Sequence, residues 1–386
     1  MSTPVPFLFI PEHIAQQFQA TRLPDAEWKE QASLAKKELA MNLKIISIFL
    51  SSVFRRPVEL NISIKGGVKK VSWLHPQDKT LLSLTFDRII PTNGLANASC
   101  SSDGHTLRFG IVRLPQHNEI VHFTSLDIVA HQVVGCALPK QLGIRILFVD
   151  ETGTIATAFA DIAAKAVQYW AFQLRESQTT WWKAQDLDMP SPENDPLDGT
   201  MWGIGDRIAN AAIPNGAFSL RRFDKPGHAY WNHPLLGDDE QRLFFQEPHI
   251  DKDHSGVQTN SGPMVRAFYR MCVEIPASPV DLFSLWTETL QCFSRHSITG
   301  FAETIQGLLA QKYPAVCDTV NRIWEETLEQ AFSSEGTKEG HLYPILPSQG
   351  RPERIREYFH RQQQSASTSS QKDGKPKKTF VFGRKK

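Results

Sequence analysis

The stretch that decides the fold reads DIVAHQVVG and covers residues 127–135. Polar residues at its start can cap a helix, and residues four apart on a helix lie on one face. His131 and position 135 therefore have the spacing of the two zinc-binding histidines in an H-E-x-x-H helix. Here Gln132 stands where the general base of that motif belongs, and Gly135 where its second histidine belongs. The predicted helix offers one imidazole and no base, and a lone histidine on an apolar helix is usually a hydrogen-bonded core residue.

A second informative stretch, ETGTIATAFAD, covers residues 151–161. Residues 155–170 repeat apolar side chains at spacings of three and four and are nearly uncharged, which predicts a buried helix. Together the two stretches resemble the thermolysin-like (M4) family of zinc metallopeptidases, whose pattern is D-[VI]-V-A-H-E-x-x-H followed by E-S-G-A-[IL]-N-E-[AS]-x-S-D. The resemblance implies an α+β, two-lobe fold, with a β-rich N-terminal lobe, a central helix and a mainly helical C-terminal lobe.

Further matches extend this resemblance from about residue 57 to residue 330. Four short motifs carry it. One lies before residue 101 and three lie after residue 200, and the last of these three is the most specific match. NASC, residues 97–100, stands where the family has N-A-F-W, the edge strand that pairs with a bound peptide. The other matches are WGIGD (202–206) with W-x-I-G-[ED], LRRFDKP (220–226) with L-R-S-M-S-D-P, and DHSGVQTNSG (253–262) with D-x-G-G-V-H-x-N-S-G.

The resemblance implies that the zinc ligands are largely lost. The first ligand position is His131, whereas the second falls on Gly135 and the third on Thr157. Catalytic zinc takes three protein ligands and a water molecule, so one histidine does not hold it. The base position is Gln132, which cannot accept a proton from water, and a positioned base is worth roughly 10²- to 10⁴-fold in rate. We therefore expect no bound zinc and no other cofactor.

The groups that stabilise the transition state in the family are also changed. Its histidine in the G-V-H motif falls on Gln258, and its oxyanion-binding tyrosine falls on Phe148 by an ungapped alignment. Two functional groups are retained. Asp161 matches the carboxylate that orients the first histidine, and Arg221 matches the arginine that binds the substrate carbonyl.

The resemblance therefore implies a peptide cleft without a hydrolytic centre. Its predicted lining residues are Asn97, Ala98, Arg221 and Asn260. Structural explanations remain open for several retained residues: Asp161 can hydrogen-bond within the core, Arg221 can form a structural ion pair, and Asn260 can form a turn. In that case His131 is a neutral buried imidazole bonded to Asp161.

Composition excludes several classes of protein. The 386 residues include 42 basic and 41 acidic side chains, so no overall field attracts nucleic acid, membranes or acidic substrates. Hydrophobic residues make up 41% of the chain, which indicates a packed globular body. The longest apolar-leaning stretch, residues 43–54, is too short to span a bilayer, and the N-terminus lacks the basic region of a secretory signal. We therefore expect a cytoplasmic protein. We also expect reduced, buried cysteines, because the five cysteines are odd in number and include no C-x-x-C pair.

Four regions are predicted along the chain. Residues 1–56 form a propeptide-like arm, since IPEHIA (10–15) is similar to the propeptide opening of the protealysin-like branch. Residues 57–137 form the N-terminal lobe, 138–332 the helical C-terminal lobe, and 333–386 a flexible basic tail. Within them we expect strands near residues 58–64, 81–86, 107–112 and 120–123, and helices near 26–43, 265–273, 280–293, 298–312 and 315–330.

The predicted function is that of a catalytically inactive thermolysin-like homologue that binds a protein or peptide, or its own N-terminal arm, in the cleft between the lobes. The alternative is a residual or remodelled zinc metalloendopeptidase. A third hypothesis, compatible with the first, has the basic tail bind nucleic acid or an acidic partner; no membrane partner is expected. A relocated metal site is also open, with His131 joined by candidates from His228, His233, His249, Asp251, Asp253 and His254.

Overall fold

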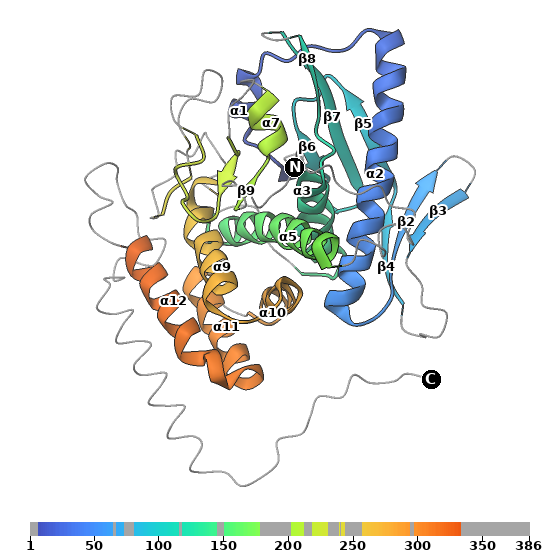
Figure 1. The fold of residues 1–386 in the computed structure, drawn as a ribbon. Coiled ribbons are helices and arrows are strands. Elements are labelled where there is room, and N and C mark those ends of the chain that lie inside the picture. The colour runs from blue at the N-terminus through green and yellow to red at the C-terminus, as the bar shows by residue number, and fades with distance from the viewer. Residues whose placement is uncertain are drawn as a thin grey trace, which may run out of the picture.

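Helix α5 (Asp150–Ser177) lies at the centre of the molecule (Figure 1). The β-sheets and the long helix α2 (Asp25–Phe54) lie on one side of it, and the C-terminal helices lie on the other. The computed structural model describes residues 7–64, 67–72, 81–115, 118–144, 150–177, 202–211, 218–230, 239, 241–243, 257–293 and 297–332.

The N-terminal residues form a short strand, β1 (Phe7–Leu8), and a short helix, α1 (Glu12–Gln17), before the long helix α2. Helix α2 begins after Pro24 with two acidic residues in its first turn, where carboxylates interact favourably with the helix dipole. The helix expected over residues 26–43 continues to Phe54. It does so because the apolar residues that follow, Ile46 and Phe49 among them, are fully buried against the core.

Two sheets form the β-rich region expected between residues 57 and 125. The main sheet has the order β1-β6-β7-β5, with β8 also paired to β7. Strand β5 runs parallel to β7, whereas the pairs β1–β6, β6–β7 and β7–β8 are antiparallel. The second sheet has the order β3-β2-β4. The bounds are β2 Val58–Ile64, β3 Gly67–Ser72, β4 Leu82–Phe86, β5 Arg88–Asn93, β6 Ala98–Cys100, β7 Thr106–Leu114 and β8 Glu119–His122.

The helix expected over residues 127–135 is α-helical only at its start. Helix α3 (Leu126–Ala130) leads into a π-helix, η1 (His131–Ala137), and then into α4 (Leu138–Gln141). The prediction of a regular helix face is therefore wrong beyond Ala130, because hydrogen bonds in a π-helix join residues five apart. Ser125 occupies the N-cap position without a side-chain cap bond, and its hydroxyl instead donates to the Asp127 carboxylate (2.6 Å).

The C-terminal half is mainly helical, as expected. Helix α5 is buried along most of the predicted stretch 155–170. A two-stranded sheet of β9 (Gly203–Ile204) and β10 (Arg221–Arg222) brings the later motifs towards α5. The remaining elements are α7 Asp206–Ala211, the 3-10 turn η3 Thr259–Ser261, α9 Gly262–Glu274, α10 Pro279–Cys292, α11 Ile298–Lys312, the 3-10 turn η4 Pro314–Val316 and α12 Cys317–Ala331.

One hydrophobic core joins side chains of the arm, the sheets and the C-terminal helices. The predicted boundaries at 56/57 and 137/138 therefore do not separate independent cores, and the division into four regions stays a prediction. The predicted tail, 333–386, lies outside the described residues. No helix in the described part of the chain is both long enough and apolar enough to cross a membrane. All five cysteines are free. Cys100 and Cys136 are buried as expected, Cys272 and Cys317 are only partly buried, and Cys292 is exposed, so the expectation of buried thiols is wrong for Cys292.

Candidate functional site

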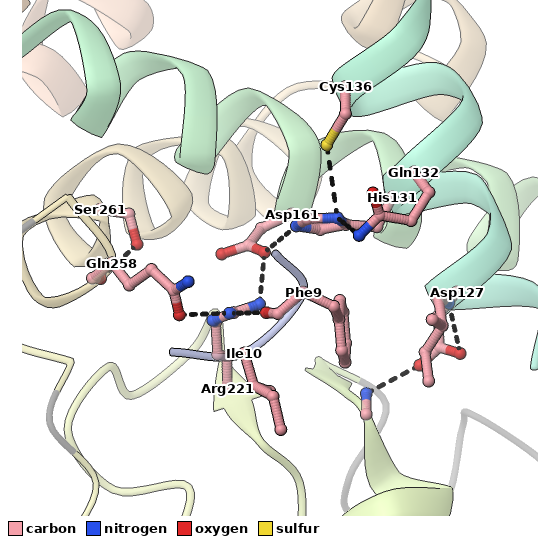
Figure 2. A network of polar contacts seen from close by, with 12 residues as sticks. Phe9, Ile10, Asp127, His131, Gln132, Cys136, Asp161, Arg221, Gln258 and Ser261 are labelled. Atoms are coloured by element: carbon pink, nitrogen blue, oxygen red, sulfur yellow. Dashed lines mark hydrogen bonds and ion pairs between the residues drawn. The ribbon is translucent and has the colours of Figure 1, made fainter. Parts of the chain in front are cut away.

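The N-terminal arm lies against the edge strand β6, at the position that the sequence assigns to a bound peptide. Phe7 pairs with Cys100 and Leu8 with Ser99 in an antiparallel register. The backbone N–H of Phe9 continues the ladder by donating to the carbonyl of Ala98 (2.9 Å). Figure 2 shows residues 9 and 10 beside the polar groups of the site.

Asn97 holds the next residue of the arm. Its Oδ1 accepts a hydrogen bond from the backbone N–H of Ile10 (3.1 Å), and its Nδ2 donates to the carbonyl of the same residue (2.8 Å). Asn97 is 3% exposed and Ile10 is 2% exposed. The side-chain amide of Asn97 therefore extends the strand-like hydrogen bonding of the arm by one residue. It binds the backbone of Ile10 and not its side chain.

Arg221 links the arm to helix α5 and to the segment that carries Gln258. Its Nη1 donates to Asp161 Oδ1 (2.7 Å), and its Nη2 donates to the Phe9 carbonyl and to Gln258 Oε1, the latter at 2.8 Å. The guanidinium carbon also lies 5.2 Å from the centre of the Phe9 ring, within the range of a cation–π interaction. Because the Asp161 carboxylate is fully buried, this ion pair is shielded from water.

His131 lies on the other side of the Asp161 carboxylate. Its Nε2 is 3.3 Å from Asp161 Oδ1, and its Nδ1 is 3.7 Å from the Sγ atom of Cys136. The Phe9 ring packs perpendicular to the imidazole at a centroid distance of 5.0 Å. Complete burial lowers the pKa of His131 from its ordinary value, and the neighbouring Asp161 acts in the opposite direction. Burial is the larger cause, so the neutral form of the imidazole is favoured relative to a histidine in water.

The residues at the three zinc-ligand positions do not fit zinc. Thr157 offers a buried hydroxyl in place of a carboxylate. At Gly135, an added Cβ atom would lie 2.2 Å from the Cα atom of Ala160, so the two helices are packed too closely for any side chain there. No cluster of three metal-binding side chains occurs within the segments that the structure describes.

The structure brings most of the predicted site residues together. Gln132 Nε2 donates to the Ala98 carbonyl (3.3 Å), which connects η1 to the edge strand. Asn260 is buried in the turn η3, beside the segment that carries Gln258. His228 is described outside the network of Figure 2, whereas Phe148 and the remaining relocated-site candidates, His233, His249, Asp251, Asp253 and His254, lie outside the described residues.

Three residues of the site were missed by sequence reasoning. Phe7 and Phe9 alternate around Leu8, and this period of two is a strand signal that can be found in the sequence. Cys136 has no such signal, because its approach to His131 depends on the π-helix, which places residues five apart on a common face.

Comparisons with known proteins agree with this architecture. Residues 145–312 match the family described as thermolysin metallopeptidase, alpha-helical domain. Protease PrtS from Photorhabdus sp. (strain Az29) is 23% identical over 155 residues, which cover 39% of this chain and 35% of PrtS. The solved precursor of protealysin, a metalloproteinase from Serratia proteamaculans, superposes with a TM-score of 0.54 at 18% identity, covering 83% of this chain and 99% of that chain. Residues 145–312 thus resemble the helical domain of the thermolysin metallopeptidases, and the superposition shows a similar fold over most of the chain.

Helix α5 also buries a lysine outside this network. Lys165 is 1% exposed, and its ammonium donates to Gln168 Oε1 (2.6 Å). Burial lowers its pKa to about 8, although the carboxylates of Asp206, Asp127 and Asp224 act in the opposite direction. The folded protein therefore binds this proton less tightly than the unfolded chain does.

This difference predicts a pH dependence of stability. Between pH 8 and 10.5 the unfolded chain binds more protons at Lys165, so its contribution to stability rises with pH across that window. Relative to a Lys165→Met variant, we expect the free energy of unfolding of the wild type to rise by up to about 3 kcal/mol between pH 7 and pH 10.5. Urea titrations of both proteins at several pH values measure the difference; a constant difference contradicts the prediction.

Proposed function

We propose that this chain is a catalytically inactive thermolysin-like homologue that acts by binding an extended peptide segment. The observation that carries the proposal is Arg221, whose guanidinium contacts both the backbone of the arm and the buried Asp161 carboxylate. By the resemblance Arg221 is the arginine that binds a substrate carbonyl, and in this structure it binds the backbone carbonyl of Phe9 in the arm. What remains is a set of groups that bind a peptide backbone.

The occupant of the site in this structure is the arm itself. Backbone pairing with β6 supplies affinity that is independent of sequence, and the burial of Phe9 supplies selectivity for a large apolar side chain. The match to the precursor of protealysin covers 83% of this chain, and it supports the interpretation of residues 1–56 as a propeptide-like arm. The arm then blocks the cleft until it is displaced, and a protein or peptide partner takes its place.

A second candidate function is residual or remodelled zinc endopeptidase activity. His131 and Asp161 are both retained, and His131 Nε2 makes no well-formed hydrogen bond within the described residues, so one nitrogen ligand remains available. This alternative needs two further ligands, and Gly135 and Thr157 do not supply them.

Zinc analysis separates the two functions. After dialysis against zinc and then buffer, we expect the purified full chain to retain well below one zinc per chain, because three protein ligands are needed. A His131→Ala variant is the matched control and should give the same low value. Zinc near one per chain that is lost in His131→Ala, together with chelator-sensitive digestion of a peptide substrate, supports the endopeptidase instead. A cytoplasmic location and a nucleic-acid or acidic partner for the tail stay predictions.

A further inference from the structure

The sequence contains the pattern Phe-apolar-Phe twice: FLF at residues 7–9 and FVF at residues 380–382. We infer that Phe380, Val381 and Phe382 form a second ligand for the groove along β6, and that they take the place of residues 7–9 when the arm leaves. The inference rests on the proposed function, because it names which segment the peptide-binding groove accepts. Under this inference, residues 7–9 and residues 380–382 compete for one binding site, and the protein has two states that differ in which segment is bound.

The groove recognises two kinds of feature in the arm (Figure 2). The first is backbone: the Ala98 carbonyl, Asn97 and Arg221 bond N–H and carbonyl groups of residues 9 and 10. The second is a pair of aromatic rings on one face of the strand, since Phe7 and Phe9 lie 6.1 Å and 5.0 Å from the His131 ring. Leu8, between them, is only half-buried.

The tail sequence meets both requirements. In the same antiparallel register, Phe380 pairs with Cys100 and Val381 takes the place of Leu8. Phe382 then takes the place of Phe9, so its N–H donates to the Ala98 carbonyl and its carbonyl accepts from Arg221. Side chains alternate along a strand, so both phenylalanine rings face His131. Thr379 and the three residues after it are all strong strand formers.

The composition of the last part of the tail, residues 361–386, singles out the same three residues, whereas the other aromatic side chains of the tail, Tyr343, Tyr358 and Phe359, lie before this part. Within residues 361–386 the only aromatic side chains are Phe380 and Phe382, and Val381 lies between them. The rest of this segment is polar, small or basic apart from Pro376, with lysine or arginine on both sides of FVF. A solvated basic tail gains nothing from two phenylalanine side chains separated by one residue, whereas a docking segment needs them.

The tail is long enough to reach the groove. Residues 333–379 lie between the last described residue, Phe332, and Phe380. A coil of that length spans about 40 Å on average. A folded body of this size has a radius of gyration of about 20 Å. The intervening chain therefore allows the tail to reach the groove of its own molecule.

The arm is the stronger of the two ligands. Ile10 and Pro11 line a small pocket together with Leu220 and Tyr230. At the position of Ile10 the tail has Gly383, which preserves the backbone bonds to Asn97 but buries no side chain. The arm therefore occupies the groove in the resting state, and the tail binds after the arm is displaced or cut.

A peptide-binding experiment on the full-length chain tests this inference. The protein carries Phe7→Ser and Phe9→Ser to weaken the arm, and Phe380→Ser and Phe382→Ser to remove its own tail motif. Three labelled peptides are titrated by fluorescence anisotropy: the arm (residues 5–18), the tail (372–386), and the same tail with both phenylalanines replaced by serine, which has an identical charge. We expect the arm peptide to bind best, and the serine tail to bind more than about tenfold more weakly than the native tail.

The outcomes separate this inference from the proposed function. If the arm peptide binds but the tail does not, or if both tail peptides bind equally, the tail inference is overturned and the groove remains a peptide site. Equal binding of the two tail peptides that weakens steeply with salt assigns the tail to an anionic partner instead. If neither arm nor tail peptide binds, the proposed function fails as well.

A second variant covers the case in which the serine substitutions prevent folding. A protease site is inserted between Gln19 and Arg22, and the tail again carries Phe380→Ser and Phe382→Ser. This chain folds with its arm in place and is cut afterwards, and dilution then releases the arm. The native tail peptide should restore protection from hydrogen exchange at residues 97–101, whereas the serine peptide should not. Equal protection by the two peptides overturns the inference.

Discussion

Replacing Arg221 with Met is expected to lower the free energy of unfolding by about 3–5 kcal/mol. The substitution removes one partner of an ion pair whose carboxylate, on Asp161, is fully buried. It also removes hydrogen bonds to the Phe9 carbonyl and to Gln258. The uncompensated charge in the interior accounts for most of the cost. Urea unfolding followed by tryptophan fluorescence measures it.

Arg222, the neighbour of Arg221 in strand β10, is the matched control. It pairs with Asp224 nearer the surface, where its side chain is 25% exposed. Replacing Arg222 with Met should cost no more than about 1 kcal/mol, because water screens such pairs. A second readout separates the arm from general stability: only Arg221→Met should accelerate tryptic cleavage at Arg22 under native conditions. Equal costs for the two substitutions would falsify the assignment of Arg221 as the central clamp.

Replacing Gly135 with Ala is expected to destabilise the protein by about 3 kcal/mol or more. The added methyl group would lie 2.2 Å from the Cα atom and 2.5 Å from the Cβ atom of Ala160. Both are fixed atoms of helix α5, so η1 and α5 must move apart to accept it. A Gly135→His variant meets the same obstacle and should not regain zinc, even when combined with Gln132→Glu.

Gly307 in helix α11 provides the control for this substitution. An added Cβ atom there meets nothing within 4 Å. Gly307→Ala should therefore stabilise the protein by about 0.5–1 kcal/mol, because alanine loses less backbone entropy in a helix. If thermal or urea unfolding shows that Gly135→Ala is also neutral or stabilising, the close packing of η1 on α5 is absent in solution, and the steric argument against zinc is lost.

These two substitutions test different parts of the site. The packing at Gly135 leaves no room for a side chain between η1 and α5. Arg221 joins the buried Asp161 carboxylate to the backbone of the arm.

Much of the fold could be predicted from the sequence because its signals are local. The four C-terminal helices follow from apolar spacing near 3.6 residues, and the strands β2, β4, β7 and β8 follow from alternation and turn residues. The extension of α2 to Phe54 was not predicted, because residues 44–54 are apolar on several sides and lack the one-sided pattern of a surface helix. Only the surrounding core shows that this segment is helical and buried.

The candidate site divides in the same way. At two positions that the resemblance assigns to zinc ligands, Gly135 offers no donor atom and Thr157 offers a hydroxyl in place of a carboxylate, and both facts can be stated from the sequence alone. The π-helix could not be predicted from the sequence, because the i, i+4 spacing of residues 131 and 135 indicates a regular α-helix. Its hydrogen bonds depend on how η1 packs against α5, and this packing places Cys136 next to His131.

The sequence alone thus determined the inventory of side chains at the positions compared with the thermolysin-like pattern: His131, Gly135 and Thr157, together with Arg221, Asp161 and Asn97. The tertiary structure decided which segment of the chain these side chains contact. The bond from Arg221 to the carbonyl of Phe9 joins residues 212 positions apart. Contacts of that range depend on how whole elements pack, not on any local pattern, so only the folded chain shows the arm in the groove.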